Sequence, residues 1–150
     1  MKKLLICTIL YLGLTQNSTF AEQPKNLHNH YKAAYQHAWC TANNGKENYE
    51  NTDFTKVDCL TENNAVKFDF HDKWAESIGP ALHYQLMTGK KAKVILILEN
   101  PKKQLVYYTR AKKIAEHYNF DIDYITSEIL NLDKNKKCHF ATCKCNEKLK

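Results

Sequence analysis

The most informative stretch for the fold is Lys56–Tyr84, KVDCLTENNAVKFDFHDKWAESIGPALHY. It contains two runs of alternating side chains, residues 55–60 and 65–70, and residues of turn-forming type separate them, which is the pattern of two antiparallel strands. A helix follows directly at residues 73–88, with Asp72 placed to cap its first turn. The stretch therefore predicts two neighbouring strands and a helix that begins where the second strand ends.

The segments on either side complete an α/β order. Apolar residues at three- and four-residue spacing predict a first helix over residues 27–42, and residues 47–51 form a further candidate strand. After the quoted stretch, the nearly continuous apolar run KVILIL at residues 93–98 is typical of a central strand covered on both faces. A helix over residues 104–118 and a strand over residues 120–125 follow. The order αβββαβαβ predicts an α/β fold in which helices flank a mixed central sheet.

Pro80 interrupts the helix predicted at residues 73–88, because proline lacks the amide hydrogen that a helix interior requires. We therefore expect a kink or a restart of the helix at Gly79-Pro80. The apolar side chains of this helix are expected to face the core, and they are Trp74, Ile78, Ala81, Leu82 and Leu86.

The first residues predict export from the cytoplasm. Lys2 and Lys3 precede an apolar run, residues 4–14, that is too short to span a bilayer comfortably, and small residues precede a cleavage position after Ala21. We expect a secretory signal peptide at residues 1–21, one domain at residues 22–132 and a basic, cysteine-containing tail at residues 133–150. The mature product is expected in the periplasm or outside the cell, without a membrane span.

Five cysteines follow Ala21, and in an exported chain cysteines are interpreted first as disulfides. Cys40 near the end of the first helix and Cys59 in a predicted strand are the natural pair, and closing this loop stabilises a fold by roughly 3 kcal/mol in the chain-entropy treatment. The sequence does not define how Cys138, Cys143 and Cys145 are connected. For these three, a disulfide that pins the tail is favoured over a metal site, because their spacing matches no common zinc module.

The charge and the motifs narrow the classes of function. A formal net charge of +6 at pH 7 permits binding to nucleic acid or to an anionic surface without arguing for it. The chain has no nucleophile elbow, no phosphate-binding glycine loop and no zinc-protease motif, which argues against esterase, kinase and protease activity. If nucleic acid is the ligand, the lysines expected to meet its phosphates are Lys90, Lys91, Lys93, Lys102 and Lys103.

The order of elements and several short motifs resemble the PD-(D/E)XK nuclease superfamily, which has the restriction-endonuclease-like fold. The motifs are VDCL at residues 57–60, VKFDF at 66–70, KWAESIG at 73–79 and ALHY at 81–84, and the match covers roughly residues 27–126. In that superfamily an aspartate on the second strand and an acidic residue on the third bind Mg²⁺ or Mn²⁺, and a lysine assists the attacking water. The resemblance therefore implies metal-dependent hydrolysis of nucleic acid phosphodiesters.

By position in the motifs, Asp58 resembles the first metal ligand. The acid expected two residues before the third-strand lysine is absent, because Ala65 stands two residues before Lys67. Asp69 shares a strand face with Lys67 and is the candidate second ligand, while Lys67 or Lys73 is the candidate catalytic lysine. The simpler interpretation of each of these side chains is a solvated strand face or a surface ion pair.

Tyr84 matches the tyrosine of a glutamine–tyrosine motif that positions nucleic acid in some branches of the superfamily, but Pro80 stands where the glutamine is expected. His71 and His83 flank the predicted site as alternative ligands or bases, although a histidine in such a position is more often structural. The altered positions favour a second hypothesis, a catalytically inactive member that acts as a binding module for nucleic acid or protein. A third is a periplasmic interaction protein that uses the fold only as a scaffold.

Overall fold

The computed structural model describes residues 28–132, so the predicted signal peptide and the tail with Cys138, Cys143 and Cys145 lie outside the described residues. The elements, in chain order, are α1 (Lys32–Ala42), β1 (Lys46–Glu50), β2 (Lys56–Leu60), β3 (Asn64–Phe70), the short 3₁₀ helix η1 (His71–Lys73), α2 (Ile78–Thr88), β4 (Lys91–Ile97), α3 (Pro101–Tyr118) and β5 (Asp121–Ile125). The predicted α/β order is confirmed. Within residues 28–132, no helix has the length and apolar character needed to cross a membrane.

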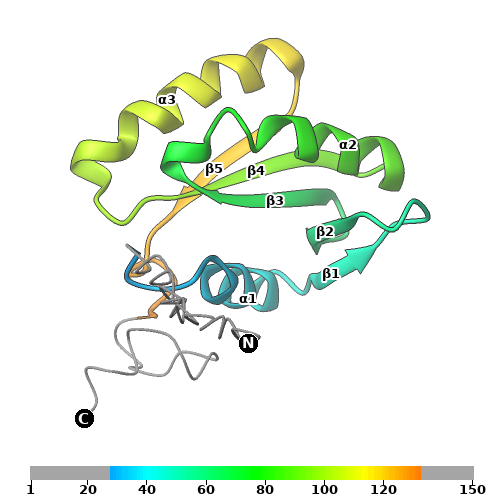
Figure 1. The fold of residues 1–150 in the computed structure, drawn as a ribbon, viewed down its shortest axis with the longest axis horizontal. Helices are drawn as coiled ribbons and strands as arrows, with labels where there is room; N and C mark the ends of the chain where they lie inside the picture. Colours follow the sequence, from blue (N-terminus) through cyan, green and yellow to red (C-terminus); the bar gives the residue numbers. More distant parts are fainter. Residues whose placement is uncertain (1–27, 133–150) are drawn as a thin grey trace, which may run out of the picture.

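The five strands lie in the sheet in the order in which they occur in the chain (Figure 1). β1, β2 and β3 pair antiparallel, and β3, β4 and β5 pair parallel, so the sheet is mixed as predicted. Short turns join the antiparallel strands, whereas α2 and α3 supply the long crossovers that parallel strands require. α1 covers one face of the sheet, and α2 and α3 cover the other (Figure 1).

β4 is the central strand that the run KVILIL predicts. Its residues Val94 to Ile97, and Leu98 after them, are completely buried. Ile95 and Ile97 belong to the hydrophobic cluster on the α1 side. Val94 and Leu96 belong to the cluster on the side of α2 and α3. Burial on both faces explains why this strand shows no alternation of apolar and polar residues.

α2 begins at Ile78 and not at residue 73, because the chain forms η1 and a turn first. Pro80 therefore stands in the first turn of the helix, where the amide nitrogen has no partner within the helix in any case. The α-helix therefore begins just before Pro80, and it neither restarts nor kinks there.

The buried face of α2 differs from the predicted one. Ser77 and Ala81 are completely buried and Tyr84 is 7% exposed, whereas Leu82 is 38% exposed and Leu86 is 79% exposed. The expectation that both leucines face the core is therefore wrong. Small side chains at the contact allow the helix to approach the sheet closely, and the leucines then lie further around its circumference.

Cys40 and Cys59 form a disulfide, as the sequence predicts, and it joins the last part of α1 to β2. Gly45, in the turn between α1 and β1, packs directly on this bond. A Cβ atom at residue 45 would overlap both sulfur atoms, so this glycine is required by space and not by backbone conformation. A structural disulfide is typical of proteins that fold in an oxidising compartment.

Candidate functional site

Asp58, Lys67 and Asp69 meet at the place where β2 diverges from β3. The register between these strands covers two residue pairs, formed on β2 by Cys59 and Leu60. At Asp58, the residue before Cys59, a side chain replaces the backbone as the hydrogen-bond acceptor. Asp58 Oδ2 accepts a hydrogen bond of 2.8 Å from the amide nitrogen of Phe68. A carboxylate thus occupies the position of a backbone acceptor and points into the gap between the strands.

Two lysines approach these carboxylates. Lys67 Nζ lies 3.2 Å from Asp58 Oδ2 and 3.4 Å from Asp69 Oδ2. Lys32, on α1, places its Nζ 3.2 Å from the same Asp58 oxygen. The side chains of Asp58, Lys67 and Asp69 are between 13% and 16% exposed, so the contacts are largely shielded from water. We call Lys32, Asp58, Lys67 and Asp69 the ion-pair network; it has no formal net charge.

Burial and the neighbouring charges set the proton affinities in the network. Burial lowers the pKa of Lys32, and the negative charge of Asp58 offsets this only in part. Burial opposes the charge of Lys67 as well, but Asp58 and Asp69 together outweigh it and hold the pKa of Lys67 above its ordinary value. Lys67 is therefore an ammonium group at neutral pH, positioned between two carboxylates.

Tyr84 lies near enough to the network for the charges of Asp58, Lys67 and Asp69 to act on it. It packs from α2 against Val57 and Ala65 in the third hydrophobic cluster. Burial raises the pKa of Tyr84, and the negative charges of Asp58 and Asp69 raise it further. The phenol is therefore neutral at physiological pH.

Sequence reasoning missed two residues of α1 that complete the site. Lys32 pairs with Asp58, and the buried Gln36 donates a hydrogen bond of 2.6 Å from Nε2 to the backbone oxygen of Asp58. The two residues are four positions apart, so they share a helix face. The spacing can be read from the sequence. Their common partner Asp58 cannot, because it lies 26 residues from Lys32 and 22 residues from Gln36.

Three other predicted site residues lie apart from the network. Lys73 is exposed in η1, and its charge is not among those that shift the pKa values of Lys32, Lys67 and Tyr84. His71 contacts the ring of Tyr107 at 5.0 Å, and burial lowers its pKa. His83 bonds Asp53 in the β1–β2 turn at 2.8 Å. The histidines therefore serve packing and a turn contact, and neither is placed as a base at the network.

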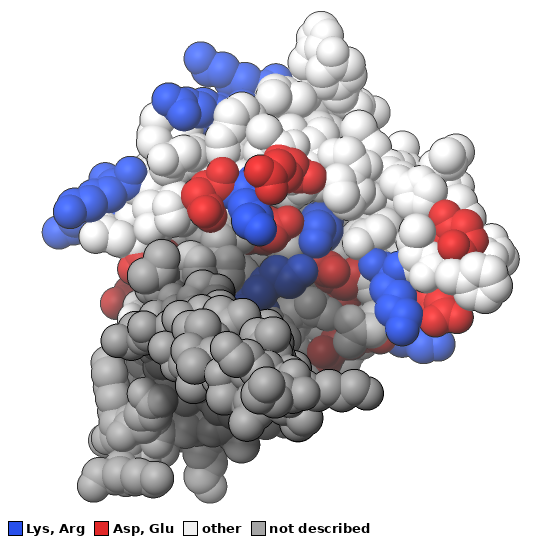
Figure 2. Space-filling view, in the orientation of Figure 1, with Lys and Arg blue, Asp and Glu red and all other residues white. Residues whose placement is uncertain are grey.

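The lysines predicted to meet phosphates do not form one cluster. Lys90 and Lys91 stand at the beginning of β4, whereas Lys102 and Lys103 lie in the first turn of α3, beyond its end. A strand of this length separates the two pairs by roughly 20 Å. Residues 28–132 contain as many lysine and arginine residues as aspartate and glutamate residues. Figure 2 accordingly shows acidic and basic groups interspersed on the visible face, without a continuous basic stripe.

A divalent metal ion fits the network poorly. Mg²⁺ is held by oxygen ligands in a demanding octahedral arrangement, with carboxylates that face the ion. Here Asp58 and Asp69 both face the ammonium group of Lys67, and the network is already neutral. Within residues 28–132, no set of three or more histidine, cysteine, aspartate or glutamate side chains is arranged to hold a metal. An ion would have to displace Lys67 from both carboxylates.

Comparison of the chain with protein-family models, with characterised proteins and with solved structures found no match. The resemblance to the PD-(D/E)XK superfamily therefore rests on the short motifs and on the order of the elements. The chain is an α/β protein with a five-stranded mixed sheet and three α-helices within residues 28–132. Membership of the superfamily stays a prediction.

Proposed function

We propose that this chain is an exported, disulfide-bonded binding module of nuclease-like fold, in which the ion-pair network stands where a hydrolytic relative would hold its metal. One observation carries the proposal: Lys67 Nζ lies within 3.2 and 3.4 Å of the two carboxylates that would be the metal ligands. An ammonium group in this position neutralises the two carboxylates and donates hydrogen bonds to them. The network therefore stabilises the place where β2 diverges from β3, and it does not activate water.

The energetics of displacement support this proposal. A divalent ion bound between Asp58 and Asp69 would release Lys67 from both of its partners and would place two positive charges beside Lys32. Like charges in a largely buried site repel strongly, because the surrounding protein screens them less than water does. The loss of the lysine pairs and the new repulsion both oppose metal binding.

The charge of the described surface favours an uncharged or weakly charged partner. Nucleic acid affinity comes largely from release of counterions by clustered lysine and arginine side chains. Residues 28–132 have no excess of lysine and arginine over aspartate and glutamate. Lys90 and Lys91 lie at one end of β4, and Lys102 and Lys103 lie beyond its other end. We therefore propose that the surface of residues 28–132 contacts a protein or a neutral polymer in preference to nucleic acid.

Metal-dependent hydrolysis of nucleic acid phosphodiesters with Mg²⁺ or Mn²⁺ is the second candidate. It is favoured by the convergence of Asp58, Lys67 and Asp69, with Tyr84 beside them, because these are the residues that the resemblance selects. This candidate requires the network to rearrange so that Lys67 leaves the carboxylates.

One experiment separates the two candidates. Oxidised protein spanning residues 22–150 is heated with Mg²⁺, with Mn²⁺ and with a chelator, and the same samples are incubated with plasmid and single-stranded substrates. We expect a melting temperature that does not depend on metal, and no cleavage. A metal-dependent rise in melting temperature, together with cleavage that is lost in Asp58→Asn, would instead establish the hydrolytic candidate.

A substitution that creates a metal site is the positive control for this measurement. Lys67→Glu places a third carboxylate beside Asp58 and Asp69, so we expect a lowered melting temperature that Mn²⁺ restores in part. Lys103→Glu makes the same change of charge at an exposed position in α3 and is expected to show no response to metal.

A further inference from the structure

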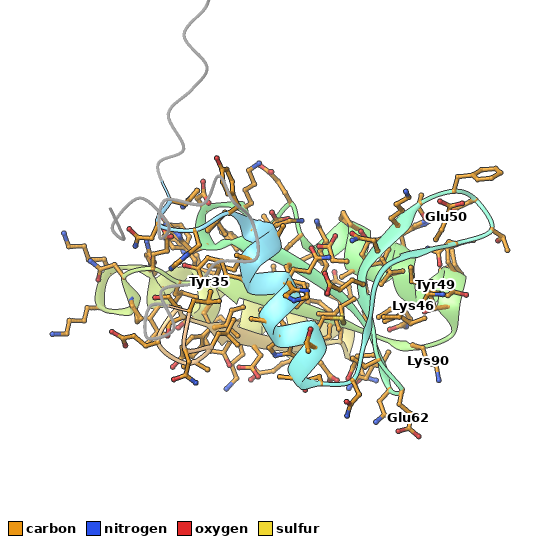
Figure 3. All side chains as sticks on the ribbon, turned by 90° about the horizontal axis from the view of Figure 1, so that it is seen from below. Tyr35, Lys46, Tyr49, Glu50, Glu62 and Lys90 are labelled. Carbon is orange, nitrogen blue, oxygen red and sulfur yellow. A yellow bond between two sulfur atoms is a disulfide. The ribbon has the colours of Figure 1, made fainter. Side chains whose placement is uncertain are left out.

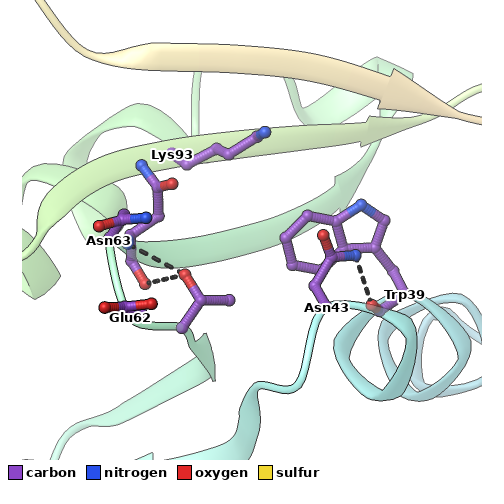
Figure 4. A pocket seen from close by; sticks show the side chains of 7 residues that line it. Trp39, Asn43, Glu62, Asn63 and Lys93 are labelled. Atoms are coloured by element: carbon purple, nitrogen blue, oxygen red, sulfur yellow. Dashed lines mark hydrogen bonds between the residues drawn. The ribbon is translucent and has the colours of Figure 1, made fainter.

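A polar cavity of about 220 Å³ lies at the C-terminal end of α1, on the side of the β2–β3 turn (Figure 4). Trp39 and Asn43 form one wall, residues 61–64 form the opposite wall, and Lys93 of β4 lies between them. The volume is below the roughly 300–1,000 Å³ of sites for drug-sized ligands, so the cavity suits a molecule of the size of one sugar ring. None of these residues belongs to the ion-pair network.

The disulfide fixes the distance between the two walls. Cys40 follows Trp39 directly on α1, and Cys59 stands two residues before the turn that begins at Thr61. The covalent bond therefore ties both sides of the cavity to each other through very short segments. A ligand that enters does not have to order the walls first, which lowers the entropic cost of binding.

Hydrogen bonds hold the turn on the second wall in one conformation. The amide nitrogen of Thr61 donates to the backbone oxygen of Asn64 at 2.9 Å, and the amide nitrogen of Asn64 donates to Thr61 Oγ1 at 3.0 Å. Asn64 Nδ2 also donates to Asp121 Oδ2 of β5 at 2.9 Å. The turn is thereby fixed internally and anchored to the sheet.

The polar groups that remain available at the cavity include both donors and acceptors. Asn43 uses its Nδ2 to bond the backbone oxygen of Trp39 at 2.8 Å, which leaves its Oδ1 as an acceptor. Glu62 and Asn63 are exposed at the tip of the turn, and Figure 3 shows Glu62 projecting from the body of the protein. Lys93 adds a charged donor on the opposite side of the cavity from Glu62.

An aromatic ring completes the lining. The rings of Trp39 and of Phe68 in the core meet at an angle of 67°, with their centres 5.5 Å apart, and Lys93 Nζ lies over the Trp39 ring, 5.6 Å from its centre. One positive and one negative side chain line the cavity, so it favours a ligand without net charge. Sugar hydroxyls donate and accept hydrogen bonds together, which matches the mixture of donors and acceptors in the lining. We propose that this cavity binds a saccharide unit.

Charged ligands fit the cavity less well. A phosphate group would meet Glu62 at the turn and Asp121 behind Asn64. The carboxylate of a free amino acid would compete with Asp123 for Lys93, whose Nζ lies 3.9 Å from Asp123 Oδ2. A neutral polyhydroxylated ring uses the donors and acceptors present without displacing the pair of Lys93 with Asp123.

Intrinsic fluorescence tests this proposal, because the chain has two tryptophans. In Trp74→Phe the remaining indole is that of Trp39, and the oxidised protein spanning residues 22–150 is titrated with N-acetylglucosamine and with glucose. We expect a saturable change in emission for at least one sugar, with a dissociation constant in the millimolar range. Adding Glu62→Gln and Asn63→Ala should weaken binding by about tenfold or more. Glu50→Gln, an exposed acid on β1, should leave it unchanged.

A second measurement does not depend on Trp74→Phe. In the wild-type protein labelled with nitrogen-15, the two indole N–H resonances report separately, and the sugar should shift that of Trp39 and leave that of Trp74 in place. The proposal is overturned if neither sugar produces a saturable change in either measurement. It is equally overturned if glycine produces the same response as the sugars, or if the Glu62 and Asn63 substitutions leave the response intact.

Discussion

The amide nitrogen of Phe68 on β3 donates its hydrogen bond to the side chain of Asp58 on β2, over 2.8 Å. The backbone pairing of the two strands includes Cys59 but not Asp58, the residue before it. The carboxylate of Asp58 therefore satisfies the amide group of Phe68, which the sheet leaves unpaired. The same oxygen accepts from the ammonium groups of Lys32 and Lys67. Asp58 is thus a structural centre of this region, whatever ligand the site takes.

Removal of the Asp58 charge should destabilise the fold strongly. Asp58→Asn leaves Lys32 and Lys67 sharing only Asp69 in a largely buried place, and we expect a loss of about 2–4 kcal/mol in the free energy of unfolding. Urea unfolding of the oxidised protein measures this. Glu50→Gln breaks the exposed pair with Lys56, at 3.6 Å, and should cost less than about 0.5 kcal/mol. Equal losses in the two variants would show that the network is only a surface feature.

Alkaline pH should destabilise the protein through Lys67 and Tyr84. The pKa of Lys67 lies above 10.5, because Asp58 and Asp69 outweigh its burial, and burial raises the pKa of Tyr84 above 10.0. Both groups keep their protons in the folded state at a pH where the unfolded chain has lost them. Their stabilising contribution is therefore complete below pH 10 and is lost as the pH rises above it.

Lys32 has the opposite effect on the pH dependence of stability, because burial lowers its pKa below 10.5. Its contribution to the free energy of unfolding therefore increases as the pH rises towards 10.5. Tyr84→Phe isolates the tyrosine contribution. Urea midpoints of this variant should fall less steeply above pH 10 than those of the wild type. Identical slopes would contradict the assignment of the tyrosine to this transition.

Gly45 should tolerate no larger side chain. Gly45→Ala would place its methyl group on the sulfur atoms of Cys40 and Cys59, and we expect a loss of about 1–3 kcal/mol. Gly79→Ala is the matched control, because nothing lies within 4 Å of its added Cβ. Alanine is also the better helix former, so Gly79→Ala should be neutral or slightly stabilising. Thermal unfolding of the two variants under oxidising conditions tests the contrast.

Phe54 should be a site where substitution increases stability. It lies at the β1–β2 turn with φ of 66° and a side chain that is 80% exposed. A bulky residue in the left-handed region costs about 1–2 kcal/mol, and its ring recovers little by burial here. Phe54→Gly should therefore raise the free energy of unfolding by about 1 kcal/mol, measured with urea. Phe54→Ala keeps a Cβ atom, so an equal gain in that variant would contradict the conformational explanation.

The local features of the fold follow from the sequence, because they depend on patterns that neighbouring residues complete. The apolar run of β4 has no alternation, and this alone predicts a strand buried on both faces. The alternation in β3 correctly places Lys67 and Asp69 together on one face. The pairing of Cys40 with Cys59 follows from the predicted position of each residue and is confirmed.

The partners of these side chains could not be found in the same way. Which charge meets Asp58 depends on how α1 crosses the sheet, and Lys32 is 26 residues away in the chain. The exposure of Leu86 depends likewise on the close approach that Ser77 and Ala81 allow. The elements, their order and the disulfide could be predicted from the residues alone, since hydrophobic periodicity and turn residues act locally. The position of Lys67 between the two acids could be known only from the folded chain, because the register and divergence of β2 and β3 bring Asp58 to it.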